Sequence, residues 1–586
     1  MAAQRASGFP SIDKPWMKYY EYGMTDQPRP HCSIYEYMYN SNKEHPSDIA
    51  IYYVNRKISY GKLFENIDSC AKAFLALGVK PGEIVTIASV SVPETLYAIY
   101  ALNRIGAVAN MIHPLAGEDE IVDYLNEVGS RVCVLFTGTY NIVGKSLGRT
   151  SVEKAIVVSP AESMRMPLSL AYKLRAKEPK LPAGSDVINW KTFIAGGKDT
   201  ELVTYERDLD SVALISHTGG TTGEPKGVMA SDNNVNSVLW QTVCRMHVPE
   251  GTIFMSVLPP FVSYSLMTSM LQPLSIGCAT LLIPKYNPNA FDMYVRRYHP
   301  NYIISIPAYW EAVCDNPKLR TRLEMMDLSC LELCAYGGEA MNPEKEIEVN
   351  HILLQRGAKG KLMKALGATE SMSLATLTYE EVNELTSVGI PLIDINCKIV
   401  DPETGDELPI NHVGEICFSG PTIMLGYYNK PEATANALRF HTDGKLWLHM
   451  GDLGRLNEDG VLFVTGRIKR IVMTKGKDGQ VTKLFPDRIE KVIDQHPDVS
   501  ACCVIGVPDD TRINYAVVYV EPRRGKEPSE EFKKDILDFC SGRLPEYQIP
   551  DDVMFIDSFP RTNRDKVDYR ALEEAMKKKI AKEQQE

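Results

Sequence analysis

Residues 212–227 read VALISHTGGTTGEPKG, an apolar run followed directly by a turn rich in glycine and threonine that ends in a lysine. Glycines reach left-handed backbone angles and leave N–H groups unshielded, so such a turn can wrap an anion. Lys226 adds a positive charge suited to phosphate. No Gly-Lys-Ser/Thr sequence ends the segment, which excludes the Walker loop. We interpret it as a cradle for a triphosphate, the alternative being a surface loop without a ligand.

Apolar runs and amphipathic patterns alternate on both sides of this cradle. From Tyr60 to Phe74, apolar residues recur at three- and four-residue steps, which predicts a helix. A second helix is expected over 93–105. Strands are expected at 84–88, 108–111, 131–136, 154–158, 211–216, 278–283 and 301–305. This alternation predicts an α/β fold with parallel sheets covered by helices.

The organisation of the chain changes near residue 468. At 586 residues the chain is too long for one ordinary domain. The last segment has its own set of expected elements: strands at 501–507 and 515–520, and helices at 487–495, 529–541 and 568–582. We therefore predict a large domain of layered sheets and helices over 1–468, and a small α+β domain over 469–586.

Composition and charge narrow the function classes. A net charge of −11 argues against nucleic acid as a partner. The 13 cysteines include no CxxC pair, and we interpret them as the reduced thiols of a cytoplasmic protein. No apolar run reaches the roughly 18 residues that a membrane helix needs. The apolar and basic segment 164–177 is compatible with a peripheral membrane contact or with a packed surface helix.

Four more segments carry residue types that a nucleotide site needs, and their order along the chain is informative. They read YGGEA at 336–340, ALGATE at 365–370, WLHMGDLG at 447–454 and FPRTNRDKVDY at 559–569. With the cradle, they resemble the motifs of the acyl-adenylate-forming superfamily, which holds acyl-CoA synthetases, adenylation domains of peptide synthetases and beetle luciferases. The chain is most similar to a bacterial-type acyl-CoA synthetase, and the resemblance extends from about Ile51 to Leu572.

The resemblance implies a nucleotide site that uses ATP and Mg²⁺. Glu370 would bind the metal, which also supplies charge to the transition state. Thr369 would bind the α-phosphate, and Asp452 and Arg467 would bind the ribose. Phosphates would lie on Thr218, Gly219, Gly220, Thr221, Thr222, Gly223 and Lys226. Adenine would lie against Gly338, Glu339, Ala340, Leu366 and Gly367, with a leucine where the family usually has an aromatic ring.

The resemblance also implies that the small domain is a mobile lid. Lys469 falls on the family's hinge position, about which the lid turns between two half-reactions. Lys566 falls on the lysine that bridges the acid's carboxylate and the α-phosphate, where a cation stabilises the developing charge. Asp565 stands where the family usually has glycine.

The acid and the acceptor are the least specified parts. Apolar residues expected at the acyl pocket are Trp240, Phe261, Val262 and Leu374. No cation is among them, which favours an uncharged aliphatic or aryl acid, with a medium- or long-chain fatty acid first. Coenzyme A is the expected acceptor. The alternatives are loading of the acid onto a separate carrier protein, and a non-catalytic acyl-nucleotide binding protein, motivated by Leu366 and Asp565.

Overall fold

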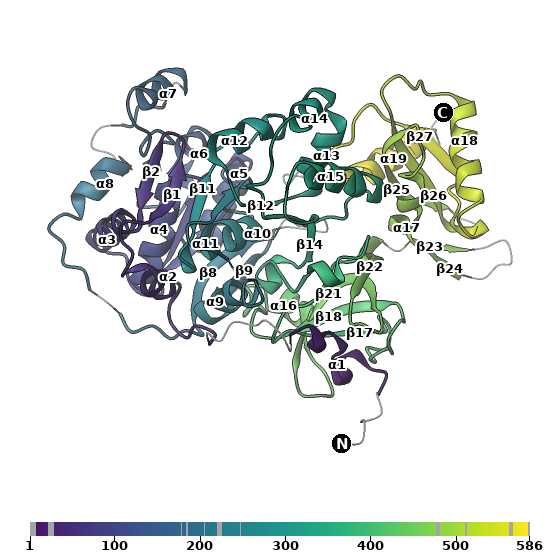
Figure 1. Ribbon diagram of the computed structural model, residues 1–586, viewed down its shortest axis with the longest axis horizontal. Coiled ribbons are helices and arrows are strands. Elements are labelled where there is room, and N and C mark those ends of the chain that lie inside the picture. Colours follow the sequence, from purple (N-terminus) through teal and green to yellow (C-terminus); the bar gives the residue numbers. More distant parts are fainter. Residues whose placement is uncertain are drawn as a thin grey trace.

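The cradle follows β8 (Val212–His217), a strand inside an eight-stranded sheet (Figure 1). The fold is that of a computed structural model. It describes residues 7–20, 28–176, 178–182, 186–203, 205–218, 225–246, 248–470, 472–475, 481–509, 512–561 and 567–583. The sheet has the order β19-β9-β8-β4-β3-β5-β6-β7, and the strands from β8 to β7 are parallel. The other strands are β3 (Ile84–Ala88), β4 (Val108–Met111), β5 (Val132–Phe136), β6 (Lys154–Val158), β7 (Val187–Asn189), β9 (Gly227–Ser231) and β19 (Gly426–Tyr427).

A second, nine-stranded sheet lies beside the first, in the order β16-β15-β14-β13-β12-β10-β11-β1-β2. Its six central strands from β14 to β1 are parallel, and the pairs at both ends are antiparallel. The strands are β1 (Ile49–Tyr53), β2 (Arg56–Ser59), β10 (Ile253–Ser256), β11 (Ala279–Leu282), β12 (Tyr302–Ser305), β13 (Leu333–Gly337), β14 (Met363–Leu366), β15 (Thr376–Leu377) and β16 (Ile390–Pro391).

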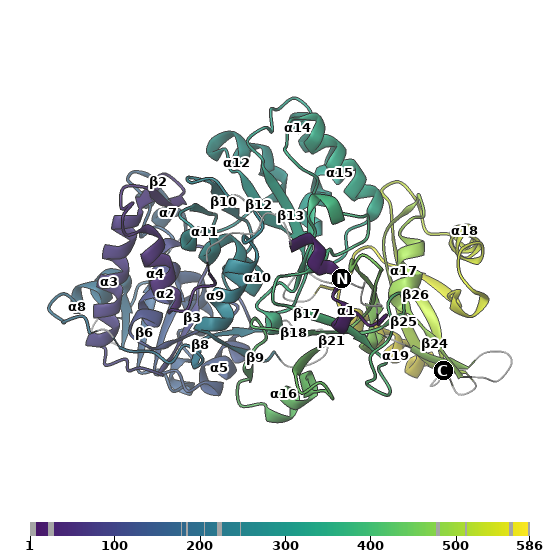
Figure 2. The same cartoon turned by 60° about the horizontal axis from the view of Figure 1, so that its bottom comes forward.

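Helices cover both sheets, as Figure 2 shows from a second direction. The predicted helix from Tyr60 is α3 (Tyr60–Ala76), whose N-terminus is capped by the Ser59 side chain. Its apolar positions, from Leu63 to Phe74, are buried. The helices before the C-terminal part are α1 (Pro10–Asp13), α2 (Ile34–Asn42), α4 (Pro93–Arg104), α5 (Glu118–Glu127), α6 (Thr137–Val143), α7 (Leu168–Ala176), α8 (Trp190–Gly196), α9 (Asp232–Gln241), α10 (Ser263–Ser265), α11 (Gln272–Ser275), α12 (Phe291–Tyr298), α13 (Pro307–Asp315), α14 (Pro317–Leu323), α15 (Pro343–Gln355) and α16 (Pro431–Ala437).

A third sheet is wholly antiparallel, which the alternating pattern did not predict. Its core order is β17-β18-β21-β20, and β22 pairs with β21. The strands are β17 (Asn396–Val400), β18 (Gly414–Ser419), β20 (Leu438–Phe440), β21 (Leu446–Leu456) and β22 (Leu462–Arg467). Antiparallel neighbours need no crossover helix, and short turns join β20 to β21 and β21 to β22, although α16 lies between β18 and β20 in the chain. The sheet therefore does not follow the strand–helix alternation of the parallel sheets.

The C-terminal part has its own core, which agrees with the predicted α+β fold. The sheet β25-β26-β27 is covered by helices on both faces, and a hairpin of β23 and β24 precedes it. The elements are β23 (Val472–Lys475), β24 (Val481–Leu484), α17 (Pro486–Ile493), β25 (Val499–Asp509), β26 (Ile513–Pro522), α18 (Glu530–Ser541), β27 (Asp552–Phe555) and α19 (Tyr569–Glu583). The fold class, α/β with a smaller C-terminal domain, is confirmed, and the boundary at 468/469 stays a prediction.

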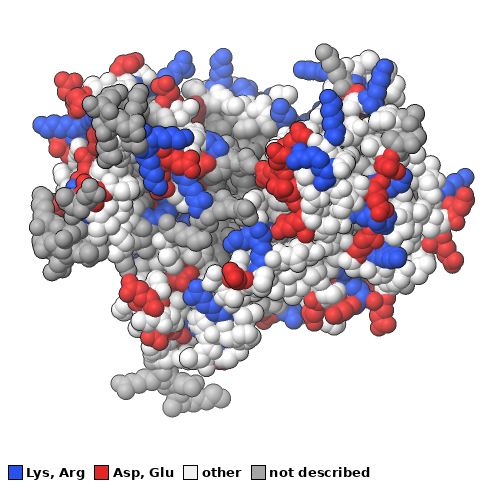
Figure 3. All heavy atoms as spheres, turned by 180° about the vertical axis from the view of Figure 1, so that it is seen from behind, with Lys and Arg blue, Asp and Glu red and all other residues white. Residues whose placement is uncertain are grey.

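The surface and the helices add two observations. Seen from behind, lysine and arginine side chains are interspersed with acidic ones (Figure 3). Within the described part of the chain, no helix is both long enough and apolar enough to cross a membrane.

Candidate active site

Two of the predicted nucleotide segments leave the sheet side by side. Gly337, the last residue of β13, is paired with Ala365 on the parallel strand β14. Residues 338–340 and 366–370 therefore begin at the carboxyl ends of neighbouring parallel strands, the edge at which α/β sheets bind ligands. Gly338 has φ +87°, and all of 338–340 is exposed. The adenine segments predicted from sequence thus lie together, and Leu366 is half-buried against the main core.

The turn after β14 is tightly built. A Cβ at Gly367 would lie 2.1 Å from the carbonyl oxygen of Ser373, so only glycine fits there. The 3-10 turn η5 (Thr369–Ser371) follows. Ser263 and Ser373 share a hydroxyl hydrogen bond of 2.7 Å, which joins the turn to the start of α10. This bracing fixes the backbone that carries Thr369 and Glu370.

A tyrosine joins two of the predicted site residues. Tyr427 on β19 donates its hydroxyl to Glu370 Oε1 at 2.6 Å, and Lys226 Nζ lies 4.6 Å from the centre of the same ring. Burial and the nearby Glu370 charge raise the pKa of Tyr427 well above its usual value, so the hydroxyl stays a donor. The pairing of Tyr427 with Val228 on β9 sets this geometry, since Lys226 directly precedes β9.

The base of the cradle is closed by backbone. Thr218 N donates to Lys226 O at 2.9 Å, and Lys226 N donates to the Thr218 hydroxyl at 3.2 Å. The cradle residues Gly219, Gly220, Thr221, Thr222 and Gly223 lie outside the described residues. Lys226 Nζ lies over the ring of Tyr427, the residue whose hydroxyl contacts Glu370.

Glu370 retains an oxygen for a metal. Its Oε1 accepts the Tyr427 hydroxyl, while its Oε2 and the Thr369 hydroxyl have no hydrogen-bond partner among the residues that the structure describes. Mg²⁺ takes oxygen ligands and commonly binds through one or two carboxylates plus substrate phosphates. The donor set therefore fits a magnesium ion shared with a nucleotide.

The two predicted ribose residues face each other across an antiparallel pair. Asp452 on β21 is opposite Arg467 on β22, and Arg467 Nε lies 3.0 Å from Asp452 Oδ1. Asp452 is buried, whereas Arg467 is exposed. A carboxylate held in place by a guanidinium is a suitable acceptor for a vicinal diol, because such hydrogen bonds are charge-assisted.

A bulge in β21 presents Asp452, and a buried glutamate holds the bulge. Glu415 and Cys417 on β18 pair with Leu453 and His449, so the three residues between those partners arch away from the ladder. Glu415 Oε1 accepts Gly451 N at 3.1 Å, and Glu415 Oε2 lies 2.8 Å from His449 Nδ1. The Glu415 carboxylate thus occupies the space that the bulge leaves.

The position predicted to be the hinge is followed by an anchored residue. Lys469 lies in the 3-10 turn η7 (Ile468–Arg470), where the structure describes its backbone only. The next residue, Arg470, donates to both oxygens of Glu490 at 2.8 and 2.6 Å. Burial opposes the charge of Arg470, but these contacts outweigh it and raise the pKa of the guanidinium. Lys566 lies outside the described residues, and its flanks Arg561 and Val567 form an isolated antiparallel bridge.

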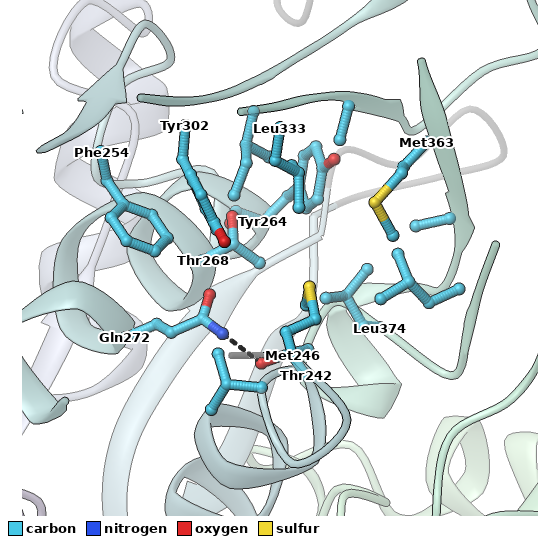
Figure 4. A pocket seen from close by; sticks show the side chains of 15 residues that line it. Thr242, Met246, Phe254, Tyr264, Thr268, Gln272, Tyr302, Leu333, Met363 and Leu374 are labelled. Carbon is cyan, nitrogen blue, oxygen red and sulfur yellow. Dashed lines mark hydrogen bonds between the residues drawn. The ribbon is translucent and has the colours of Figure 1, made fainter. Parts of the chain in front are cut away.

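A cavity of about 40 Å³ lies against the nine-stranded sheet (Figure 4). That is room for about three waters. Strands β10, β12, β13, β14 and β15 form one wall. Residues 242–246, which follow α9, and residues of the helical stretch 264–272 close its other side. The lining residues are Thr242, Val243, Met246, Phe254, Tyr264, Thr268, Gln272, Tyr302, Ile304, Leu333, Ala335, Met363, Ala365, Leu374 and Leu377. None of them is charged, and Ala365 and Leu374 flank the 366–370 turn.

Of the four residues predicted for the acyl pocket, Leu374 lines this cavity. Trp240 is buried in the main core. Phe261 packs against the His113 ring at 4.3 Å between centroids, and Val262 is half-buried beside it. The strands that line the cavity are β10, β12, β13, β14 and β15, and of these only β12 was among the strands expected from the sequence.

Fold and candidate site together have the features expected of a nucleotide-using enzyme, with an uncharged cavity beside the turn of Thr369 and Glu370. The sequence model of the family described as AMP-binding enzyme matches residues 38–428, and that of the AMP-binding enzyme C-terminal domain matches 488–566. The chain belongs to the AMP-binding enzyme family, within the adenylate-forming acid–CoA ligases, which confirms the predicted class.

Relatives of known name span nearly the whole chain. A long-chain-fatty-acid–CoA ligase of Bacillus subtilis is 26% identical over 95% of this chain and 97% of its own. A 4-coumarate–CoA ligase 2 of Nicotiana tabacum is also 26% identical, over 92% of this chain and 93% of its own. The crystal structure of ATP-bound MatB from Rhodopseudomonas palustris shares the fold, with a TM-score of 0.78 and 22% identity over 93% of this chain and 98% of that one.

Proposed function

We propose that this protein activates an uncharged carboxylic acid with ATP and Mg²⁺ as its acyl-adenylate, and then transfers the acyl group to coenzyme A. The observation that carries the substrate class is the cavity without a charged residue, next to the turn of Thr369 and Glu370. An acid tail with its own charge would lose its hydration there without gaining a partner.

In the first step, a carboxylate oxygen of the acid attacks the α-phosphorus, and the bond from that phosphorus to the pyrophosphate oxygen breaks. Lys226 and Thr218 orient the phosphates, and Asp452 with Arg467 orients the ribose. Lys566 draws the two anionic reactants together and stabilises the charge that develops between them. Mg²⁺ on Glu370 supplies charge to the phosphates when bound.

In the second step, the sulfur of coenzyme A attacks the acyl carbon, and AMP leaves with the electron pair of the broken C–O bond. The two steps need different groups at one carbon, which is the physical reason for a lid that turns at Lys469. Transfer to a separate carrier protein is the alternative, and it uses the same first step.

Within the class of uncharged acids, we propose a medium- or long-chain fatty acid first and an aryl acid second. Each buried methylene contributes about 0.8 kcal/mol, so an apolar cavity favours longer tails. The cavity is narrow as it stands, but Met246 and Met363 line it (Figure 4). Methionine side chains have three rotatable bonds, and their movement would widen the cavity. The names of the fatty-acid and coumarate ligases among the relatives support both acid types.

The test is acid-dependent exchange of labelled pyrophosphate into ATP, run over a panel of acids. The panel contains saturated fatty acids of increasing length, cinnamate-type aryl acids, and dicarboxylic and amino acids as charged controls. We expect exchange with the uncharged acids and none with the charged ones. Exchange with charged acids alone would refute the substrate class. AMP formation on adding coenzyme A would then show that coenzyme A, and not a carrier protein, is the acyl acceptor.

A further inference from the structure

Helix α7 lies at the periphery of the molecule and exposes apolar side chains to solvent. In Figure 1 it lies above β2, apart from the packed layers, and Figure 2 also places it beside β2. No residue of α7 is buried. Leu170 and Leu174 are 50% and 73% exposed, and Met166, just before the helix, is 66% exposed. Soluble monomers rarely direct an apolar helix face to water unless that face has a partner.

The orientation of α7 follows from helix geometry. At 3.6 residues per turn, Leu170, Ala171 and Leu174 share one face, and all three are exposed. The other side carries Ser169, Tyr172 and Lys173, which are half-buried, and Lys173 Nζ lies 3.6 Å from Glu162 Oε1. The exposed side of the helix is therefore apolar, whereas the half-buried side is polar except for Tyr172.

The segment is held in this orientation. Tyr53 donates its hydroxyl to Pro160 O at 2.5 Å, in the chain that leads to α7. Asn55, in the turn between β1 and β2, makes two hydrogen bonds to the backbone of Arg165, at 3.0 and 3.2 Å. An open hollow of about 380 Å³ adjoins the helix, and Met166 and Leu170 stand at its border while remaining 66% and 50% exposed; Met164 and Lys191 also line it.

Positive charge surrounds the apolar face. Arg165 and Arg175 are exposed at the two ends of the segment, and neither has a carboxylate partner among the described residues. Lys191, at the hollow, is likewise exposed and outside any ion pair that the described residues form. Lysine and arginine side chains also project from this corner in the view from behind, at the upper right of Figure 3. These free cations stand out in a chain with a net charge of −11.

We propose that α7 and its flanks, residues 164–176, dock the protein on an anionic lipid bilayer. Leu170, Leu174 and Met166 enter the boundary between headgroups and acyl chains, while Arg165 and Arg175 pair with lipid phosphates. Apolar burial combined with basic residues is the arrangement by which amphipathic helices lie in an interface. A bilayer suits both parts of the surface, whereas an apolar protein partner would leave the arginines unpaired.

The test is co-sedimentation of the full chain with vesicles. One set is phosphatidylcholine alone, and the other is phosphatidylcholine and phosphatidylglycerol in equal parts. We expect binding to the anionic set that weakens with added salt. The double variant Arg165→Gln with Arg175→Gln should lower the partition coefficient of the protein onto anionic vesicles about 25-fold, because each cation near such a surface contributes about a factor of five.

The contribution of the apolar side chains is tested with the double variant Leu170→Ser with Leu174→Ser. Its matched control is Ile347→Ser with Leu354→Ser on α15, where the side chains are 57% and 42% exposed. We expect about a tenfold loss of vesicle binding in the α7 pair and none in the α15 pair. Ligase activity in solution should be unchanged in both, since neither pair contacts the site. Equal binding of all variants would overturn the proposal, as would a dimer in solution that the α7 pair alone dissolves.

Discussion

The hydrogen bond between Tyr427 and Glu370 offers a sharp test of the candidate site. Tyr427→Phe removes one oxygen and keeps the ring over which Lys226 Nζ lies at 4.6 Å. The contact that is lost is a 2.6 Å hydrogen bond to a carboxylate in a partly buried setting. Glu370 then loses the donor that fixes the position of its carboxylate, on which we place Mg²⁺.

The magnitude follows from the type of bond. A hydrogen bond to a charged group contributes about 1.5–3 kcal/mol, and each 1.4 kcal/mol is a factor of ten, so kcat/KM should fall about 10- to 100-fold. The assay is acid-dependent ATP–pyrophosphate exchange, measured as Mg²⁺ is titrated. Because the carboxylate is the affected group, we expect a higher Mg²⁺ concentration at half-maximal rate.

The control is Tyr428→Phe, one residue further on. Tyr428 is half-buried, and its hydroxyl has no hydrogen-bond partner among the described residues. We expect its rate to stay within twofold of wild type, as for a surface substitution of about 0.4 kcal/mol or less. If the two variants behave alike, or if Tyr427→Phe leaves the Mg²⁺ dependence unchanged, the placement of the metal on Glu370 is wrong.

Three other variants test the site, the cavity and the core. Glu415→Ala leaves the Gly451 N–H and His449 without their acceptor, and so loosens the bulge that presents Asp452. The dissociation constant for ATP, measured by calorimetry, should rise about tenfold. Unchanged affinity would show that the bulge does not depend on Glu415. Ala335→Phe fills the cavity from β13, so exchange with long acids should fall at least about 100-fold while short acids react; equal losses would place the acid elsewhere. Burial raises the pKa of Glu94 to about 7, so its contribution to stability is present below the unfolded pKa and is lost as pH rises through 7. Glu94→Gln should therefore raise the free energy of unfolding at pH 8 by up to about 3 kcal/mol, seen as a higher apparent Tm, and leave both little changed near pH 4. An equal gain at both pH values would contradict this.

Much of the fold is visible in the sequence because local patterns specify it. The apolar spacing from Leu63 to Phe74 is that of a helix with one buried face, and the strands at 84–88 and 154–158 are short apolar runs bounded by turns. Pairing partners are less visible. Strands β8 and β4 lie next to each other although about a hundred residues separate them in the chain, and nothing local specifies that contact.

The site divides in the same way. Glycine and threonine in the cradle, and the Gly-Asp pair at 451–452, carry their chemistry in residue type and order. Tyr427 and Glu415 do not, because each acts through a partner that the fold brings close. Tyr427 lies outside the segments that pointed to a nucleotide site, and its role depends on the pairing of β19 with β9. Glu415 becomes informative only when the bulge at Gly451 is seen.

We propose that Lys566 promotes the joining of the acid to AMP, and that this step precedes the encounter with coenzyme A. The most direct measurement compares the two half-reactions in Lys566→Ala: acid-dependent ATP–pyrophosphate exchange, and thioester formation from an acyl-adenylate supplied ready-made. We predict that exchange falls about 10²- to 10³-fold, as for the loss of other single charge-stabilising groups, while thioester formation persists. Equal loss of both half-reactions, or full exchange in the variant, would contradict the claim.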